Sequence, residues 1–298
     1  MGSKRKFWFT HQELGRCLFK WGRPDSGEDW AEKFACEIAD LLNLPHAEYE
    51  LGECRGQGGL ITKTFIPPNG GFVPGNWILR RSVKDYPSTG PTSRVFSRVR
   101  EHTLAIILGI NRRYRNLKLP VSWEPLAGIT RPEEVFVGYL MLDALIGNTD
   151  RHHENWAWVF QLGFEPGSGI RVHLAPTYDH ASCLGRELKD DERRERLTTK
   201  DRNRSVEIYA TKAVSAIFDT PSDKKPLTTF DVFQKAALQF PNPAHVWLEK
   251  LLSISAENFA EIAARFPESR ISPSAAESAL EVIRINRKRL LELKKVLS

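Results

Sequence analysis

The sequence predicts an α+β fold with two lobes, a small β-rich N-lobe over residues 1–85 and a larger, mostly helical C-lobe over residues 86–298. Short β-prone runs surround a single amphipathic helical pattern before the loop Tyr86–Pro91, and helical patterns dominate after it. The chain of 298 residues exceeds the ~150 residues of a typical domain, so it is long enough for one two-lobed unit with a sizeable core.

The N-lobe is expected to contain four strands and one helix. The strands are predicted at Phe7–Thr10, Cys17–Trp21, Ala47–Gly52 and Gly59–Ile66. The helix begins at Ser26 or Asp29, either of which can cap it, and reaches Leu42. Its apolar residues recur at helical spacing, at Trp30, Phe34, Ile38 and Leu41. This pattern is typical of a helix that packs one side against a small sheet.

The C-lobe is expected to be helical around one pair of strands. Helices are predicted at Ser97–Leu108, at Pro132–Ile146 and from Ser272–Pro273 to the end of the chain. The strands are predicted at Trp156–Phe160 and Ile170–Leu174. The mixed-charge segment Lys189–Arg204 has few apolar residues, and we expect it to be mobile without substrate. The alternative is an exposed helix supported by ion pairs, with Glu192 and Arg196 among the partners.

Composition limits the compartment and the partners. Lys and Arg outnumber Asp and Glu by 43 to 37, an excess that suits an anionic ligand without requiring nucleic acid, so direct nucleic-acid binding is not expected. The four cysteines are scattered and form no Cys-x-x-Cys pair, which argues against a zinc site and a disulfide framework. No apolar run approaches the roughly 18 residues of a membrane span. We therefore expect a cytoplasmic protein without a membrane partner.

Three oxygen-bearing side chains form the most informative pattern. Asp150 is followed five positions later by Asn155, and Asp179 comes after the pair of predicted strands. Phosphoryl transfer from Mg-ATP needs a group that orients the attacking hydroxyl and oxygen ligands for the metal. This spacing matches the catalytic and metal-binding residues of protein kinases, with Asp150 orienting the hydroxyl and with Asn155 and Asp179 holding Mg²⁺. The sequence therefore predicts a phosphotransferase.

This region has two other interpretations. An isolated Asp-x-x-x-x-Asn is usually a turn after a helix, but the flanking strands and the pair Tyr178–Asp179 favour the catalytic interpretation here. His152 and His153 could form a metal pair, yet neighbouring side chains diverge, so a shared ion is not expected. A structural or phosphate-contacting role is the better interpretation for His152.

An ATP-dependent kinase also uses a strand lysine, a helix glutamate and a phosphate-binding loop. Lys20 ends a β-prone run, although a lysine on a strand is more often an exposed edge residue. The helix that follows offers Glu28, Glu32 and Glu37. Upstream, the only candidate loop is Gly2–Lys6, which contains neither G-x-x-x-x-G-K-[ST] nor G-x-G-x-x-G.

These motifs resemble those of the HipA-like kinases, distant relatives of protein kinases and phosphatidylinositol kinases. The string Leu145–His152 with Asn155 is similar to the catalytic motif of that family, and Leu174–Asp179 is similar to its metal-binding motif. The resemblance implies a two-lobed protein-kinase-like fold with ATP and Mg²⁺ as cofactors. It implies that Asp150 is the catalytic base and that Asn155 and Asp179 are the Mg²⁺ ligands.

The resemblance also assigns residues to the nucleotide site. Lys20 would be the ATP lysine, and Glu32 would be its helix partner, with Glu28 as the alternative. The other nucleotide-binding residues would be Gly2, Ser3 and Lys4 in the glycine-rich loop, Lys63 and Phe65 near the adenine, and His152 and Tyr178. Ser3 occupies the place of loop serines that some members of the family phosphorylate on themselves.

The expected activity is transfer of the γ-phosphate of ATP to a Ser or Thr hydroxyl of a protein. The resemblance leaves open whether the protein is a toxin paired with a helix-turn-helix antitoxin, and aminoacyl-tRNA synthetases are among the targets of the family. A phosphatidylinositol or small-molecule kinase is the alternative, because phosphatidylinositol kinases share a similar Asp-Arg-His-x-x-Asn string. A third interpretation, from another class, is a nucleotide-binding pseudokinase that acts as a regulator.

Overall fold

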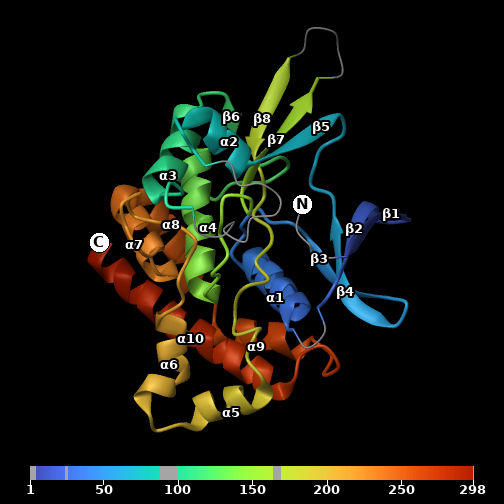
Figure 1. Cartoon of the computed structure of the whole chain (residues 1–298), viewed down its shortest axis with the longest axis vertical. Coiled ribbons are helices and arrows are strands. Elements are labelled where there is room, and N and C mark those ends of the chain that lie inside the picture. The colour runs from blue at the N-terminus through green and yellow to red at the C-terminus, as the bar shows by residue number, and fades with distance from the viewer. Residues whose placement is uncertain (1–4, 24–25, 88–98, 164–168, 298) are drawn as a thin grey trace.

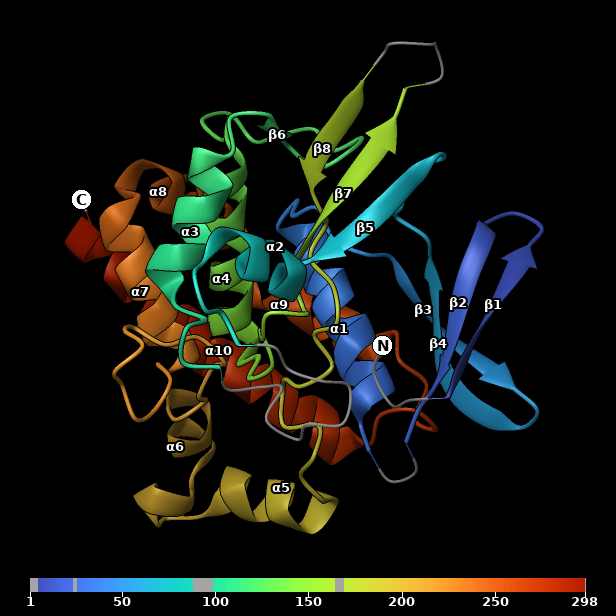
Figure 2. The ribbon, with the colours of Figure 1, turned by 45° about the horizontal axis from the view of Figure 1, so that its top comes forward.

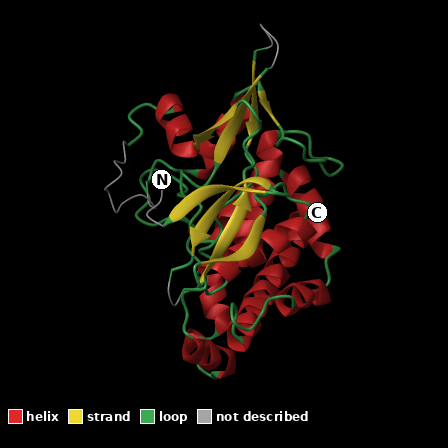
Figure 3. Cartoon of the chain, turned by 90° about the vertical axis from the view of Figure 1, so that its right-hand side faces the viewer, coloured by secondary structure: helices red, strands yellow, loops and turns green. Residues whose placement is uncertain are grey.

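The computed structural model describes residues 5–23, 26–87, 99–163 and 169–297, so the expected loop residues Gly2, Ser3 and Lys4 lie outside the described residues. Two four-stranded sheets lie beside a body of helices, which confirms the predicted α+β class and the helical C-terminal region (Figure 1). Figure 3 shows the two sheets as separate groups of strands, with most of the helices gathered on one side of them.

The N-terminal sheet is antiparallel, with the strand order β1-β2-β4-β3. Its strands are β1 (Lys6–His11), β2 (Gly15–Trp21), β3 (Tyr49–Cys54) and β4 (Gln57–Lys63). A tight turn joins β1 to β2, and Gly15 adopts the left-handed conformation there, with φ of 72°. Helix α1 (Glu28–Leu41) packs against β3 and β4, as the helical spacing of its apolar residues predicts.

The second sheet has the strand order β5-β7-β8-β6. Its strands are β5 (Gly70–Pro74), β7 (Ala157–Leu162), β8 (Ile170–Leu174) and the short β6 (Leu117–Lys118), which runs parallel to β8. Helix α2 (Gly75–Ser82) follows β5 directly. The lobe boundary at residue 85 stays a prediction, and the pairing of β5 with β7 joins residues on both sides of it in one sheet.

The helical body surrounds α4 (Pro132–Ile146), of which nearly every residue is buried. The other helices are α3 (Leu104–Arg113), α5 (Asp190–Thr198), η1 (Arg202–Arg204), α6 (Val206–Thr211), α7 (Thr229–Gln239), α8 (Pro241–Leu252), α9 (Ala256–Ala264) and α10 (Pro273–Leu297). One continuous hydrophobic cluster runs from α1 through α4 to α10, so the N-terminal helix shares the core of the helical body. In the described part of the chain, no helix has the length and apolarity needed to cross a membrane.

One sequence-based expectation about a helix needs correction. Helix α3 begins at Leu104 rather than Ser97, because Thr103 caps it by accepting a hydrogen bond from the backbone N–H of Ile106. The segment Lys189–Arg204 contains α5 and η1, which fits the alternative of a helix with ion pairs, and its mobility without substrate stays a prediction. Arg193 anchors α5, since it is buried and bonds to the Asp190 side chain and to the backbone carbonyl oxygen of Gly185.

The segment after α9 fastens α1 and the N-terminal sheet to the helical body. Phe266 stacks on Phe34 of α1, with 5.6 Å between the ring centroids. Arg270 donates from Nη2 to Asp29 Oδ2 of α1 at 2.6 Å, and it also donates to the carbonyl oxygens of Gly52 in β3 and Gly59 in β4. Both members of the Arg270–Asp29 pair are largely buried, so one guanidinium ties three elements together.

We expect Arg270→Gln to lower the free energy of unfolding by about 3 kcal/mol, because it leaves the largely buried Asp29 carboxylate without its cation. Urea unfolding checks this value. Arg270→Lys keeps the charge but lacks the planar fork, so it should recover only part of the loss. Equal stability of Arg270→Gln and the parent would contradict a structural role for this contact.

Candidate active site

The loop after α4 is built on a buried ion pair. Gly147 ends α4 in the left-handed conformation, with φ of 66°. The Arg151 side chain points inward and is 1% exposed. It donates hydrogen bonds to both carboxylate oxygens of Asp143, from Nε at 2.7 Å and from Nη2 at 2.8 Å. Asn148 donates to the same carboxylate at 2.8 Å. Burial alone would lower the pKa of Arg151, but the Asp143 carboxylate outweighs burial and the pKa is raised.

The same loop presents Asp150 at the surface. Arg151 Nη1 donates to the carbonyl oxygen of Asn155 at 2.7 Å, and the Asn155 side-chain amide donates to the carbonyl oxygen of Asp150 at 2.7 Å. The backbone N–H of Asp150 donates to Asn148 Oδ1. The backbone of Asp150 is therefore held on both sides, while 39% of its side-chain surface stays exposed.

The loop that carries Asp179 lies against this loop. The Tyr178 hydroxyl donates to the carbonyl oxygen of Glu154 at 2.6 Å, and the backbone N–H of Thr149 donates to the carbonyl oxygen of Ser182 at 3.0 Å. These bonds join the segment 149–154 to the segment 178–182 at both ends. Asp150 and Asp179 therefore lie on two loops that are hydrogen-bonded to each other.

The predicted lysine reaches Asp179 from the N-terminal sheet. Lys20 Nζ on β2 lies 3.8 Å from Asp179 Oδ1 and 5.9 Å from the ring centroid of Tyr49. Lys20, Glu32 and Asp179 line one small cavity between the sheet and α1. The strand lysine expected from the sequence therefore lies beside the aspartate that was expected to bind metal.

Glu32 has a different partner from the one expected. No ion pair joins it to Lys20 among the residues that the structure describes, and its Oε1 instead accepts a hydrogen bond from the backbone N–H of His180 at 2.8 Å. The Nδ1 atom of His180 lies 3.2 Å from the same oxygen, and its Nε2 lies 2.7 Å from Thr177 Oγ1. Glu28, the alternative, bonds to Arg186 at 3.0 Å. Glu32 therefore holds the loop next to Asp179.

His180 was not singled out from the sequence. It directly follows Asp179, but nothing local marks it, because Glu32 is 148 residues away. His180 and Glu32 are 2% and 1% exposed, so the contact is shielded from water. It couples the position of α1 to the position of Asp179.

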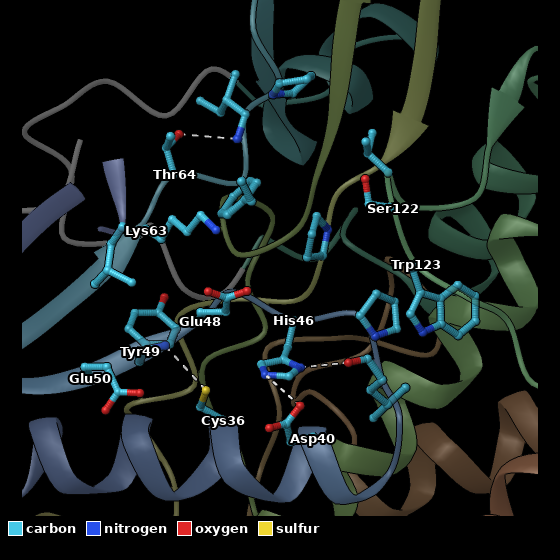
Figure 4. Close-up of a pocket in the computed structure, with 18 of the residues that line it drawn as sticks. Cys36, Asp40, His46, Glu48, Tyr49, Glu50, Lys63, Thr64, Ser122 and Trp123 are labelled. Atoms are coloured by element: carbon cyan, nitrogen blue, oxygen red, sulfur yellow. Dashed lines mark hydrogen bonds and ion pairs between the residues drawn. The ribbon is translucent and has the colours of Figure 1, made fainter. Parts of the chain in front are cut away.

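Lys63 and Phe65 line a separate cleft of about 920 Å³, bounded by α1, β3, β4 and the loop 121–123. Figure 4 shows Lys63 and Glu48 projecting into this cleft, with His46 and Asp40 near α1. Its lining includes none of Lys20, Asp150, Asn155 and Asp179, which contribute the predicted chemistry. Phe65 has a second contact, because its ring stacks on Tyr178 with 5.7 Å between the centroids. The adenine contacts assigned to Lys63 and Phe65 stay predictions.

The two adjacent histidines diverge, as their spacing predicted. Their rings are nearly perpendicular, with an interplanar angle of 88° and 6.2 Å between the centroids. His152 accepts a hydrogen bond at Nδ1 from the backbone N–H of Glu154, and its Nε2 lies 3.9 Å from Asp150 Oδ1. His153 points into the core, where its Nδ1 lies 2.8 Å from the Tyr86 hydroxyl. The rings therefore do not share an ion-binding position.

The residues present fit Mg-ATP. Asp150 and Asp179 each keep 39% of their side-chain surface exposed, although Asn148, Arg151 and His153 around them are buried. Carboxylate and amide oxygens are the ligands that Mg²⁺ prefers, and Lys20 adds a positive charge for phosphate.

Comparisons with known proteins agree with this geometry at the level of the fold. No protein-family model and no curated protein matches the sequence. The chain is similar to the crystal structure of the Helicobacter pylori proinflammatory kinase CtkA, with a TM-score of 0.72 and 18% identity over 100% of this chain and 93% of that chain. It is also similar to the Shewanella oneidensis toxin–antitoxin protein HipA in complex with HipB and operator DNA. That match has a TM-score of 0.55 and 14% identity, and it covers 99% of this chain and 66% of that chain. The chain therefore has a kinase-like fold.

Because His153 is buried, we expect the free energy of unfolding to decrease at acid pH. Burial lowers the pKa of His153 to about 4, and His152 acts in the same direction. An unfolded histidine titrates at about pH 6.5. Between about pH 6.5 and about pH 4 the unfolded state therefore binds more protons than the folded state, so the free energy of unfolding decreases as the pH is lowered. We expect a loss on the order of 2 kcal/mol from about pH 7 to about pH 4.5 from this residue alone.

Urea unfolding over this pH range, for the parent and for His153→Phe, measures the contribution. The variant should show a shallower dependence on pH, because the residue that resists protonation is absent. Identical pH dependence in the two proteins would show that His153 titrates normally.

Proposed function

We propose that the protein is an ATP-dependent phosphotransferase, a HipA-like protein kinase that transfers the γ-phosphate of ATP to a Ser or Thr hydroxyl of a protein. The observation that carries the proposal is the joining of the two predicted loops. Tyr178 bonds to Glu154 and Thr149 bonds to Ser182, which supports a site shared by the half-buried Asp150 and Asp179. The kinase-like fold supports the same conclusion.

In this mechanism Asp150 is the catalytic base. It orients the acceptor hydroxyl and takes up the hydroxyl proton at a carboxylate oxygen as the phosphoryl group is transferred. Asn155 and Arg151 hold the backbone around it, so the carboxylate does not need to reorganise during the reaction. Its exposed surface allows a protein chain to reach it.

Asn155 and Asp179 would hold Mg²⁺, which would supply positive charge to neutralise the phosphates. Lys20 lies next to Asp179 and would contact the α- and β-phosphates. Glu32 keeps the Asp179 loop in place through His180. The Gly2–Lys4 loop would cover the phosphates, with Ser3 as a site of self-phosphorylation.

More specific roles than phosphate transfer are also proposals. The likeness to HipA, whose structure contains HipB and operator DNA, supports a toxin with an antitoxin partner as one such role. A phosphatidylinositol or small-molecule kinase and a nucleotide-binding regulator without transfer are the other candidates. The presence of all three residues Asp150, Asn155 and Asp179 favours an active enzyme over the regulator.

Incubation of the protein with γ-labelled ATP, Mg²⁺ and a cell lysate, followed by phosphosite mapping, tests the proposed function. We expect label on Ser or Thr of one or a few proteins, and no label with Asp150→Asn. Label in the lipid fraction would replace the protein acceptor with a lipid. No label in any fraction, with ATP bound, would leave only the regulator.

Substitutions at the two aspartates should have different effects. Asp150→Asn should reduce transfer at least about a hundredfold with Mg-ATP affinity changed less than about twofold, because a base acts mainly in the transition state. Asp179→Asn should weaken Mg-ATP binding roughly tenfold or more, because it removes a metal ligand.

Calorimetric titration with Mg-ATP and single-turnover kinetics measure the two effects. Asp191→Asn is a matched control, since its side chain is 96% exposed on α5. The same loss of affinity in Asp150→Asn and Asp179→Asn would show that the assigned division of roles is wrong.

A further inference from the structure

Helix α2 is fastened to the catalytic loop at its first turn. The backbone N–H of Gly75 donates to the carbonyl oxygen of Trp156 at 2.8 Å, and that of Asn76 donates to the carbonyl oxygen of His153 at 2.7 Å. The Asn76 side chain also donates to Glu154 Oε1 at 3.0 Å. A Cβ atom at Gly75 would lie 2.3 Å from the Trp156 ring, so only glycine allows this approach. The position of α2 is therefore set by the loop that carries Asp150.

The exposed side of α2 combines one aromatic residue with several cations. Ile78 and Leu79 are buried, whereas Trp77 is 67% exposed, the highest value among the aromatic residues that the structure describes. Arg80, Arg81 and Lys84 are exposed on α2 and just beyond it. Figure 2 shows α2 next to the end of β5. Asp85 is the only acidic residue between Gly75 and Pro87.

The cations of α2 differ from those of the other charged helices. On α5, Arg194 pairs with Asp191 and Arg196 pairs with Glu192. On α10, Arg284 pairs with Glu281 in the same way. By contrast, no ion pair or hydrogen bond involves the side chains of the α2 cations within the described ranges of the chain. Their positive charge is thus available to a partner, next to an exposed indole that can pack against it.

We propose that α2 is a docking surface for an acidic segment of the protein substrate, located close in sequence to the acceptor hydroxyl. This inference rests on the proposed function, because it names the class of substrate for the same site. Guanidinium groups and Trp are the side chains most often found at the centre of protein interfaces, and free guanidinium groups bind carboxylates or phosphates in a bidentate manner.

The geometry sets the spacing of the segment. Arg80 and Arg81 lie about 8 Å along α2 from its first turn, at ~1.5 Å per residue. An extended peptide covers this length with about three residues, at ~3.3 Å per residue. The stretch from Asp150 to that turn adds to this length, so acidic residues that reach Arg80 and Arg81 would lie at least about three positions from the acceptor hydroxyl.

A nucleic acid is the other polyanion that could bind cations and an indole. The observations favour a peptide, because the surface is one short helix beside a loop that acts on a hydroxyl, whereas nucleic-acid sites follow the backbone with a longer positive groove. An oligonucleotide is therefore included in the test.

The test is fluorescence anisotropy with a labelled peptide in which four Glu begin three residues after a single Ser, and with a second peptide in which Lys replaces Glu. We expect the acidic peptide alone to bind the parent. Arg80→Glu with Arg81→Glu should weaken binding about tenfold or more, since each exposed ion pair contributes up to a factor of about five and reversal adds repulsion. Trp77→Ala should weaken it several-fold, and Trp77→Phe should retain most of the affinity.

The matched control is Lys224→Glu with Lys225→Glu, which makes the same change of net charge on an exposed loop before α7. This variant should bind the acidic peptide as the parent does. Equal weakening in both double variants would overturn the proposal, because it would reduce the effect to net charge. Failure of the parent to bind the acidic peptide, or preferential binding of a single-stranded oligonucleotide that is lost in the α2 variant, would overturn it as well.

The binding assay separates this inference from the proposed function, because it requires no phosphate transfer. Mg-ATP affinity and the unfolding midpoint, measured for each variant, establish that the site and the fold are intact. Peptide binding through α2 in a protein that transfers no phosphate would support the docking surface and contradict the kinase. Phosphate transfer that is equally fast to the Glu peptide and to the Lys peptide would contradict the docking surface and leave the kinase in place.

Discussion

The buried ion pair between Asp143 and Arg151 is the constraint on which the rest of the site depends. The Arg151 guanidinium is 1% exposed, so its charge must be neutralised inside the protein. The Asp143 carboxylate in the central helix α4 neutralises it and accepts two hydrogen bonds from it. Removing one partner of such a pair typically costs about 3–5 kcal/mol. Because Arg151 is directed inward and also binds the carbonyl oxygen of Asn155, the loop closes on itself and leaves the preceding Asp150 side chain at the surface.

Other parts of the molecule are positioned from this loop outward. Glu154 receives the Tyr178 hydroxyl from the Asp179 loop at its carbonyl oxygen and the Asn76 amide from α2 at its side chain. The Asp179 loop is tied in turn to α1 through the contact of Glu32 with His180. Arg270 then fixes α1 to the N-terminal sheet, which carries Lys20. The N-terminal sheet and the helical body therefore meet at Asp179, where Lys20 of the sheet lies 3.8 Å from its carboxylate.

The sequence was sufficient to predict the helices and strands whose signal lies in neighbouring residues. The spacing of Asp150 and Asn155, the strands beside them and the apolar pattern of α4 depend on neighbours in the chain, and the structure has the elements where they were predicted. The partner of Glu32 could not be predicted, since it lies 148 residues away and is chosen by packing. The order of α5 depends on the burial of Arg193 against Gly185, which its mixed-charge sequence does not reveal. The existence of a second cleft, at Lys63 and Phe65, also follows only from the three-dimensional arrangement.

The central claim is that the nucleotide binds beside Lys20 and Asp179 rather than in the cleft at Lys63 and Phe65. A crystal structure with Mg²⁺ and a non-hydrolysable ATP analogue tests this claim most directly. The account predicts a metal ion held by Asn155 and Asp179, phosphates beside Lys20, and the terminal phosphate facing Asp150. A nucleotide seated instead in the cleft between α1, Lys63 and the loop 121–123, with Asp179 away from any metal, would contradict it.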